Sequence, residues 1–264
     1  MRQRRTADKI EMRSLYPEEP RKMDVIGHLE ELRWRIIVVV AALIAASVLA
    51  FSFGEKLMVI VRAPAVPFIN NLIYISPPEA FLAYIKVSLL AGFMISFPVV
   101  LYQLWSFIAP AVTARNRPRI FIWFVLALAL FVGGISFSYF IAIPAALKFL
   151  ISFGSRIAIP QITVGKYVSF FGALMLVGGT VFEIPIIIAI GTDIGIINSR
   201  FLRQKRPMAV LVIMIAAAII TPTQDIINML IFAVPMIILY EIGIILARLI
   251  EKHTKTTSST SRTS

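Results

Sequence analysis

Six apolar stretches alternate with polar, mostly basic segments along this chain of 264 residues. A helix of about 20 apolar residues is long enough to cross the hydrocarbon core of a bilayer, which is roughly 30 Å thick. The pattern therefore predicts an all-α polytopic membrane protein with six transmembrane helices, at residues 34–53, 81–109, 120–147, 167–190, 208–220 and 226–246.

The fifth stretch, residues 208–220, spans only about 20 Å as a helix. A run that short is more often re-entrant or interfacial than spanning. Basic segments lie before it and after the sixth stretch, however, and the positive-inside rule favours placing both on one side of the membrane. We therefore expect it to cross, with 221–224 as a tight outer turn. Spans five and six are then short and should thin the bilayer around them.

The formal net charge is +12, and most of the 26 lysines and arginines fall in segments that six spans would place on one side. The positive-inside rule then puts both termini in the cytoplasm. A basic chain can also bind nucleic acid, but charges that flank apolar spans favour topology as their cause. We expect the lipid bilayer, and no nucleic acid, as a partner.

Composition divides the chain into three parts. Residues 1–24 mix both charge signs with two prolines and are expected to be a flexible cytoplasmic arm. Residues 25–250 form the membrane domain, and residues 251–264 a polar cytoplasmic tail. The long polar start does not fit a cleavable signal peptide. We interpret residues 54–79 as a long proline-broken loop whose apolar side chains need cover.

Catalytic patterns are missing from the sequence. It has no phosphate-binding loop, no cysteine, and only two histidines, His28 and His253, which lie outside the spans. A buried metal site or a Ser-His dyad would lack its imidazole. Asp225 has no second intramembrane aspartate with which to form a protease dyad. We expect neither an enzyme nor a cofactor or metal.

Carboxylates inside the membrane need a reason, because burying an unpaired charge costs several kcal/mol. Glu183 could face a cavity or partner helix, or it could be protonated and hydrogen-bonded internally. Glu241 lies near the inner face and could be partly solvated. Asp225 could cap the sixth helix. Lys86 is expected to extend outward to the interface.

A dense charge cluster precedes the first span. Glu30 and Glu31 are followed by Arg33 and Arg35, next to the apolar run. Two carboxylates and two guanidiniums at a membrane surface could form a recognition site, or they could be an ordinary anchor.

Several motifs occur in a fixed order over about residues 24–250. They are His28-Leu-Glu-Glu-Leu-Arg33, Ala63-Pro64, the run 97–111 from Phe97-Pro98 to Ala111, Phe182-Glu-Ile-Pro185, Lys205-Arg-Pro207, Thr221-Pro222 with Asp225, and Ala233-Val-Pro-Met236 with Glu241-Ile-Gly243. The ordered set resembles the TatC family, the multi-span subunit of the twin-arginine protein translocase.

The resemblance implies a cupped bundle of six helices with both ends cytoplasmic, in the cytoplasmic (inner) membrane. It implies a signal-peptide receptor and core component of a translocase that exports folded proteins with the proton-motive force. The implied partners are twin-arginine signal peptides and TatA-like and TatB-like single-span proteins in a multimeric complex. The residues alone leave a secondary transporter or channel open, although such proteins often show repeats and paired broken helices.

The resemblance also assigns roles to residues. The signal-peptide-binding candidates are Glu30, Glu31, Leu32, Arg33, Phe107, Asn116 and Arg117. The partner-docking candidates are Glu183, Asp225, Asn228, Met229 and Glu241, and Pro64 and Pro98 are expected to be structural, Pro98 through a kink. Asn116 stands where the family usually has a second acid, and Met229 where it often has glutamine. Because a guanidinium pair prefers carboxylates, our hypothesis is that Glu30, or Glu18 and Glu19, compensates.

Overall fold

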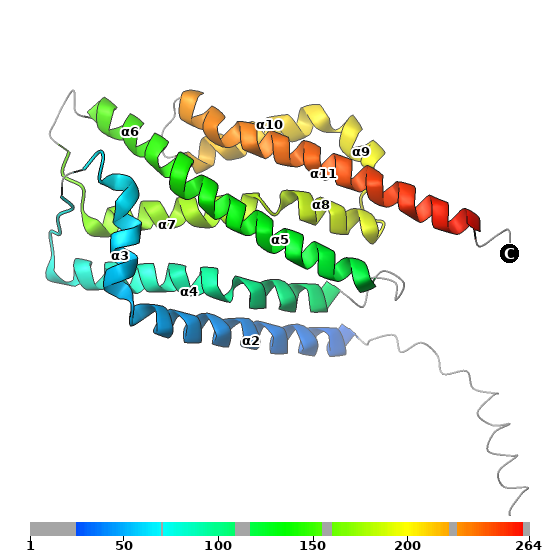
Figure 1. Ribbon diagram of the computed structural model, residues 1–264, viewed down its shortest axis with the longest axis horizontal. Helices are drawn as coiled ribbons and strands as arrows, with labels where there is room; N and C mark the ends of the chain where they lie inside the picture. Colours follow the sequence, from blue (N-terminus) through cyan, green and yellow to red (C-terminus); the bar gives the residue numbers. More distant parts are fainter. Residues whose placement is uncertain (1–24, 70, 109–116, 155–159, 222–225, 261–264) are drawn as a thin grey trace, which may run out of the picture. The chain divides into compact units, whose positions relative to one another are not determined.

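The computed structural model describes residues 25–69, 71–108, 117–154, 160–221 and 226–260 (Figure 1). The chain divides into two units, Met1–Val38 and Val39–Ser264. Within the described ranges all regular elements are helices, apart from a single parallel bridge between Ile73 and Thr163. The all-α prediction is confirmed. The expected arm at residues 1–24 lies outside the described residues.

Five stretches of helix in the described ranges are long and apolar enough to cross a membrane. A sixth apolar helix, α10, is shorter, as the sequence predicts. The spans are made by α2 (Val25–Phe51), α4 (Pro77–Ile108), α5 (Arg117–Phe137) with α6 (Ile143–Gly154), α7 (Val164–Val181) with α8 (Ile184–Asp193), α10 (Arg206–Ile220) and α11 (Ile226–Thr260).

The segment after α2 is not the loop that its prolines suggest. It contains α3 (Gly54–Arg62) and a short 3₁₀ turn, η1 (Ala63–Ala65). Two tyrosines from other helices hold α3 by its backbone: Tyr167 donates to the carbonyl of Val61 at 2.7 Å, and Tyr139 to that of Ile60 at 2.9 Å. Of the apolar residues that follow α3, Phe68, Ile69 and Leu72 pack on the core. Val66, Tyr74 and Ile75 stay exposed, so the expected cover is only partly present.

Spans three and four are interrupted, although the sequence predicts single helices. A π-helical turn, η4 (Ser138–Ala142), separates α5 from α6. Span four breaks after Val181, and Pro185 lies in the first turn of α8. Proline has no backbone N–H to donate, so it fits the first turn of a helix and not its interior. The span predicted over 167–190 is present, but it is made of two helices, α7 and α8.

Glycines bring α5 and α7 into close contact within the larger unit. A Cβ atom built on Gly178 would lie 1.8 Å from Ser138 Oγ and 2.9 Å from the carbonyl oxygen of Gly134. Ser138 is fully buried and donates to the carbonyl of Leu174 at 3.0 Å. Small residues allow membrane helices to approach in this way, and dispersion contacts between the helices then stabilise the pair.

Helix α11 is the central packing partner for the C-terminal half. It packs against α8, where Ile188 touches Gly243, and against α10 and α9 (Ser199–Gln204). It continues to Thr260, well past the predicted end of span six, and its apolar part, Ile226–Lys252, is long enough to cross a membrane. The prediction that span six is short is therefore wrong. Glu251 on this extension accepts hydrogen bonds from the backbone N–H of Ser199 at 2.7 Å and from its hydroxyl at 2.5 Å. The first part of the expected polar tail is thus a helix that holds α9.

Candidate functional site

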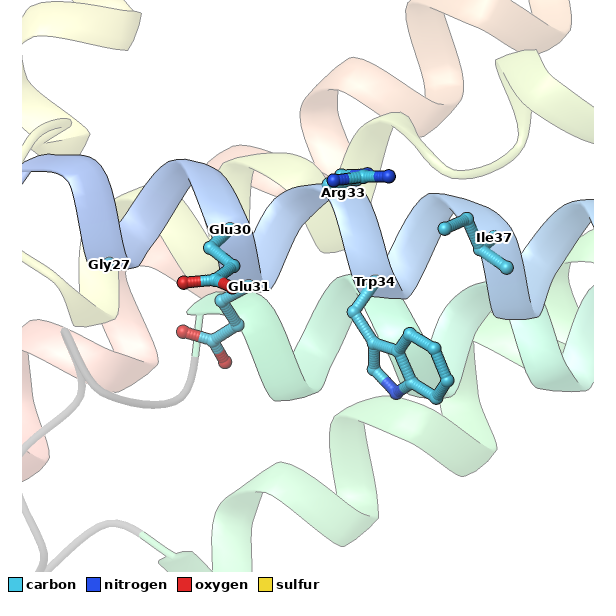
Figure 2. Close-up of a pocket in the computed structure, with 6 residues that line it drawn as sticks. All are labelled: Gly27, Glu30, Glu31, Arg33, Trp34 and Ile37. Carbon is cyan, nitrogen blue, oxygen red and sulfur yellow. The ribbon is translucent and has the colours of Figure 1, made fainter.

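The charged start of α2 carries a groove of about 440 Å³, called here the α2 groove. It is lined by Gly27, Glu30, Glu31, Arg33, Trp34 and Ile37. Figure 2 shows the carboxylates of Glu30 and Glu31 next to each other, with Arg33 and Trp34 extending from opposite sides of the helix. Because residues three and four apart share a helix face, the indole of Trp34 lies on the side of the two acids, and the guanidinium of Arg33 extends from the other side (Figure 2).

Glu31 is paired within its own helix. Arg35 Nε donates to Glu31 Oε1 at 3.1 Å, and Arg35 Nη2 makes a second, shorter contact with the same oxygen. The glutamate lies four residues before the arginine, which is the favourable order for such a pair on a helix. The predicted site omits Arg35, although its spacing from Glu31 is a signal that could have found it.

Glu30 and Arg33 differ from this pair. Both side chains are exposed, and neither forms an ion pair with any residue in the described ranges. Glu30 therefore presents an exposed carboxylate beside one that Arg35 already holds. A cationic ligand would meet two acids with different surroundings.

The other predicted signal-peptide residues are not all described. Leu32 is exposed on α2 and does not line the groove, and Phe107 lies half-buried in the last turn of α4. Asn116 lies outside the described residues. Arg117 begins α5. The structure thus brings together the residues on α2, and the rest of the predicted set stays a prediction.

Glu183 lies at the junction between α7 and α8 and is 9% exposed. Its carbonyl accepts the N–H groups of Ile186 and Ile187, both at 3.0 Å, which starts the new helix. Its side-chain Oε1 is buried and has no hydrogen-bond partner among the described residues. A buried polar atom without a partner is costly, so an outside group that reached Glu183 would relieve that cost.

The other partner-docking candidates do not form one cluster with it. Glu241 on α11 pairs with Arg206 at the start of α10, and both side chains are about two-fifths exposed, which fits a partly solvated acid near the interface. Asn228 is buried and Met229 half-buried in the first turn of α11. Twelve residues of helix put Met229 about 18 Å from Glu241 along the axis. Asp225 lies outside the described residues.

The two prolines expected to be structural lie in different settings. Pro64 is buried in the 3₁₀ turn η1, where it occupies the first turn. Pro98 lies inside α4, half-buried, and α4 is continuous through it. Their architectural role stays a prediction.

Comparison with known proteins sets this geometry in a family. The family model described as TatC, Sec-independent protein translocase protein, matches residues 27–235. The chain belongs to the TatC family. The match includes the α2 groove, Glu183 and the first turn of α11, and ends just before Glu241.

Curated TatC proteins are similar over nearly the whole length. The Sec-independent protein translocase protein TatC of Carboxydothermus hydrogenoformans is 36% identical over 88% of this chain and 96% of its own. That of Aquifex aeolicus is 36% identical over 88% of this chain and 98% of its own. This chain is thus a multi-pass membrane protein with a role in twin-arginine translocation, and the alternative of a small-solute transporter is set aside.

Solved TatC structures share the fold. A crystal structure of the twin arginine translocase receptor TatC superimposes with a TM-score of 0.73 and 36% identity, over 85% of this chain and 99% of that one. A second structure of that receptor, in DDM, gives a TM-score of 0.74 over 83% of this chain and 99% of that one. The overall fold is therefore that of these TatC structures.

Proposed function

We propose that this chain is the receptor for twin-arginine signal peptides in its translocase, and that Glu30 and Glu31 bind the peptide's arginines. The observation that carries the proposal is the α2 groove, in which two neighbouring carboxylates lie on one helix of a chain that belongs to the TatC family. The solved structures that share this fold are of a twin arginine translocase receptor, which supports the same role.

The two acids play different parts in this proposal. Arg35 holds Glu31 by two contacts to Oε1, which fixes the carboxylate's orientation before a ligand arrives. Glu30 is exposed and supplies the charge that attracts an incoming guanidinium. Hydrogen bonds between guanidinium and carboxylate are among the strong ones in proteins because both groups are charged. Trp34 offers an aromatic face to the second arginine, since guanidiniums stack on indoles.

The remaining predicted residues complete the proposed contact. Leu32 and Phe107 would meet the apolar part of the signal, and Arg117 and the neutral Asn116 would border its charged part. Because Asn116 contributes no charge, the acids on α2 carry more of the charge recognition than in relatives with two acidic sites.

We further propose that single-span partners, TatA-like and TatB-like, dock on the hairpin of α10 and α11 and at the junction of α7 and α8 in the cytoplasmic membrane, in a multimeric complex driven by the proton-motive force. The proposed contacts are Glu183, Asp225, Asn228, Met229 and Glu241. In support, α10 has 15 residues, about 22 Å, and several of its large apolar side chains are exposed. A helix this short thins the surrounding bilayer, and a partner helix would cover the apolar face.

The test is direct binding of a twin-arginine peptide to purified protein with Glu30→Gln, Glu31→Gln or both. Each single change should weaken binding roughly tenfold or more, and the double change at least about 100-fold, because each charged hydrogen bond contributes about 1.5–3 kcal/mol. Glu55→Gln, an exposed glutamate on α3, is the matched control and should bind normally. A twin-lysine peptide should bind more weakly throughout. Unchanged binding in the double variant would refute the assignment.

A further inference from the structure

A second groove, called here the α4–α7 groove, lies apart from the residues assigned above. It has a volume of about 640 Å³, and its walls come from α4 and α7 with Leu43 of α2. Phe93, Val168 and Leu176 are among its apolar lining residues, and Gly172 and Ala173 leave room along α7. This volume lies within the range of ligand-binding pockets, about 300–1,000 Å³.

One end of the groove is basic. Lys86 and Ser169 line both this groove and an adjoining pocket of about 520 Å³, to which Lys166 also contributes. Lys86 Nζ donates to Ser169 Oγ at 2.8 Å. A long apolar groove thus continues into a cationic pocket, and a hydroxyl lies at the point where they meet.

Among the described residues, one acid lines this end against two lysines, so its positive charge is only partly offset. Glu79 is the acid that lines the pocket, and its carboxylate already accepts the backbone N–H groups of Gly165 and Ile75, both at 3.0 Å. Neither Lys86 nor Lys166 forms an ion pair with a residue in the part of the chain that the structure describes. The pocket therefore favours an anion.

The length of the groove matches one leaflet of a bilayer. From Ser169 to Thr180, its lining extends over eleven residues of α7, about 16 Å. Half of a hydrocarbon core of roughly 30 Å is about 15 Å. An acyl chain whose headgroup lies at the lysines would therefore end near Thr180, at the middle of the membrane.

We propose that the α4–α7 groove binds one anionic phospholipid, with its phosphate at Lys86, Lys166 and Ser169 and an acyl chain along α7. Basic pockets between membrane helices recognise anionic headgroups in this manner, and lysine stems lie along apolar surface while their ammonium groups reach the polar layer. A transmembrane segment is a poorer occupant, because it would have to bring its own buried anion to satisfy the lysines. The predicted topology places this headgroup in the outer leaflet.

Binding of phosphatidylglycerol to delipidated full-length protein, followed by native mass spectrometry, tests the proposal. Phosphatidylglycerol should bind as one tight copy, and phosphatidylcholine with the same chains at least tenfold more weakly. Lys86→Gln with Lys166→Gln should weaken phosphatidylglycerol binding roughly 10- to 30-fold, whereas Lys86→Arg with Lys166→Arg should retain it. The matched control is Lys56→Gln with Lys148→Gln, which removes two exposed lysines elsewhere and should change nothing.

Two further experiments separate the contribution of the lysine charges from that of the lipid's acyl chain. Ala173→Leu fills the groove and should abolish tight binding, while Ala129→Leu, at an exposed alanine of α5, should not. Dihexanoyl phosphatidylglycerol and inorganic phosphate should compete only weakly, because they lack the long chain. Equal affinity for the two lipids, or equal loss in the control variants, would overturn the proposal.

A photo-crosslinker at Leu176 identifies the occupant in native membranes. Crosslinks to lipid support the proposal. Crosslinks to a second copy, to a single-span protein or to a signal segment would overturn it. Neither the lipid-binding measurement nor the crosslinking depends on signal-peptide binding. A failure of the lipid proposal can therefore be told apart from a failure of the proposed receptor function.

Discussion

Replacing Gly178 by alanine should destabilise the contact between α5 and α7. The new Cβ would lie 1.8 Å from Ser138 Oγ, 2.9 Å from the carbonyl oxygen of Gly134 and 3.1 Å from Ser138 Cβ. Rotating the serine hydroxyl away removes the first overlap but gives up its buried bond to Leu174. The overlap with backbone is relieved only if the two helices move apart.

The expected loss in the free energy of unfolding has two parts, the steric overlap and the lost hydrogen bond of Ser138. Overfilling a packed site costs about 1–3 kcal/mol, and a side-chain hydrogen bond between membrane helices contributes about 0.6–1.7 kcal/mol. Together they predict a loss of about 2–4 kcal/mol in the free energy of unfolding. Unfolding by SDS titration in mixed micelles, followed by circular dichroism, measures it.

Gly172 on the same helix is the matched control. A Cβ there would lie 3.7 Å from Leu90, an ordinary contact, so Gly172→Ala should be neutral or slightly stabilising. Adding Ser138→Ala to Gly178→Ala removes the worst overlap and should restore part of the loss. The reasoning is refuted if Gly178→Ala is as stable as Gly172→Ala, or if the second change restores nothing.

Two other contacts give smaller effects. Tyr167→Phe leaves the buried carbonyl of Val61 without its donor and should lower the free energy of unfolding by about 1–3 kcal/mol in the same titration. Tyr139→Phe removes an exposed hydrogen bond and should cost less. A larger loss for Tyr139→Phe than for Tyr167→Phe would contradict this view of how α3 is held. Glu251→Ala removes both bonds to Ser199 and should speed amide hydrogen exchange in α9 at least severalfold, while unchanged exchange there would show that α11 does not hold α9.

The sequence predicts the membrane spans well because apolar length decides them. It also identifies α10 as short, since the run itself is short. It fails where local chemistry competes with hydropathy. Residues 54–79 look like a loop because of their prolines, yet Gly54–Arg62 forms a helix that tertiary contacts hold. Hydropathy also does not reveal the helix break at Glu183, although Pro185 two residues later is typical of a helix start.

The same limit holds at the scale of side chains, but between helices rather than within one. The neighbouring acids Glu30 and Glu31 can be found as a cluster from sequence alone. Their difference also follows from spacing, because Arg35 lies four residues after Glu31 and five after Glu30, and only the first of these spacings favours an ion pair on a helix. The lysines of the α4–α7 groove come from different helices, and only the packing of α4 on α7 brings Lys86 to Ser169.

The bridge between Ile73 and Thr163 has a consequence for biosynthesis. The N–H of Ile73 donates to the carbonyl of Ile162, and that of Val164 to the carbonyl of Ile73, so the segments before α4 and α7 are joined directly. The ribosome synthesises Ile73 long before Thr163. The hydrogen bonds of this bridge therefore cannot form until the start of α7 has been synthesised and has reached the first spans. A chain arrested before residue 163 should therefore leave the segment around Ile73 open to protease, and extension past α7 should protect it.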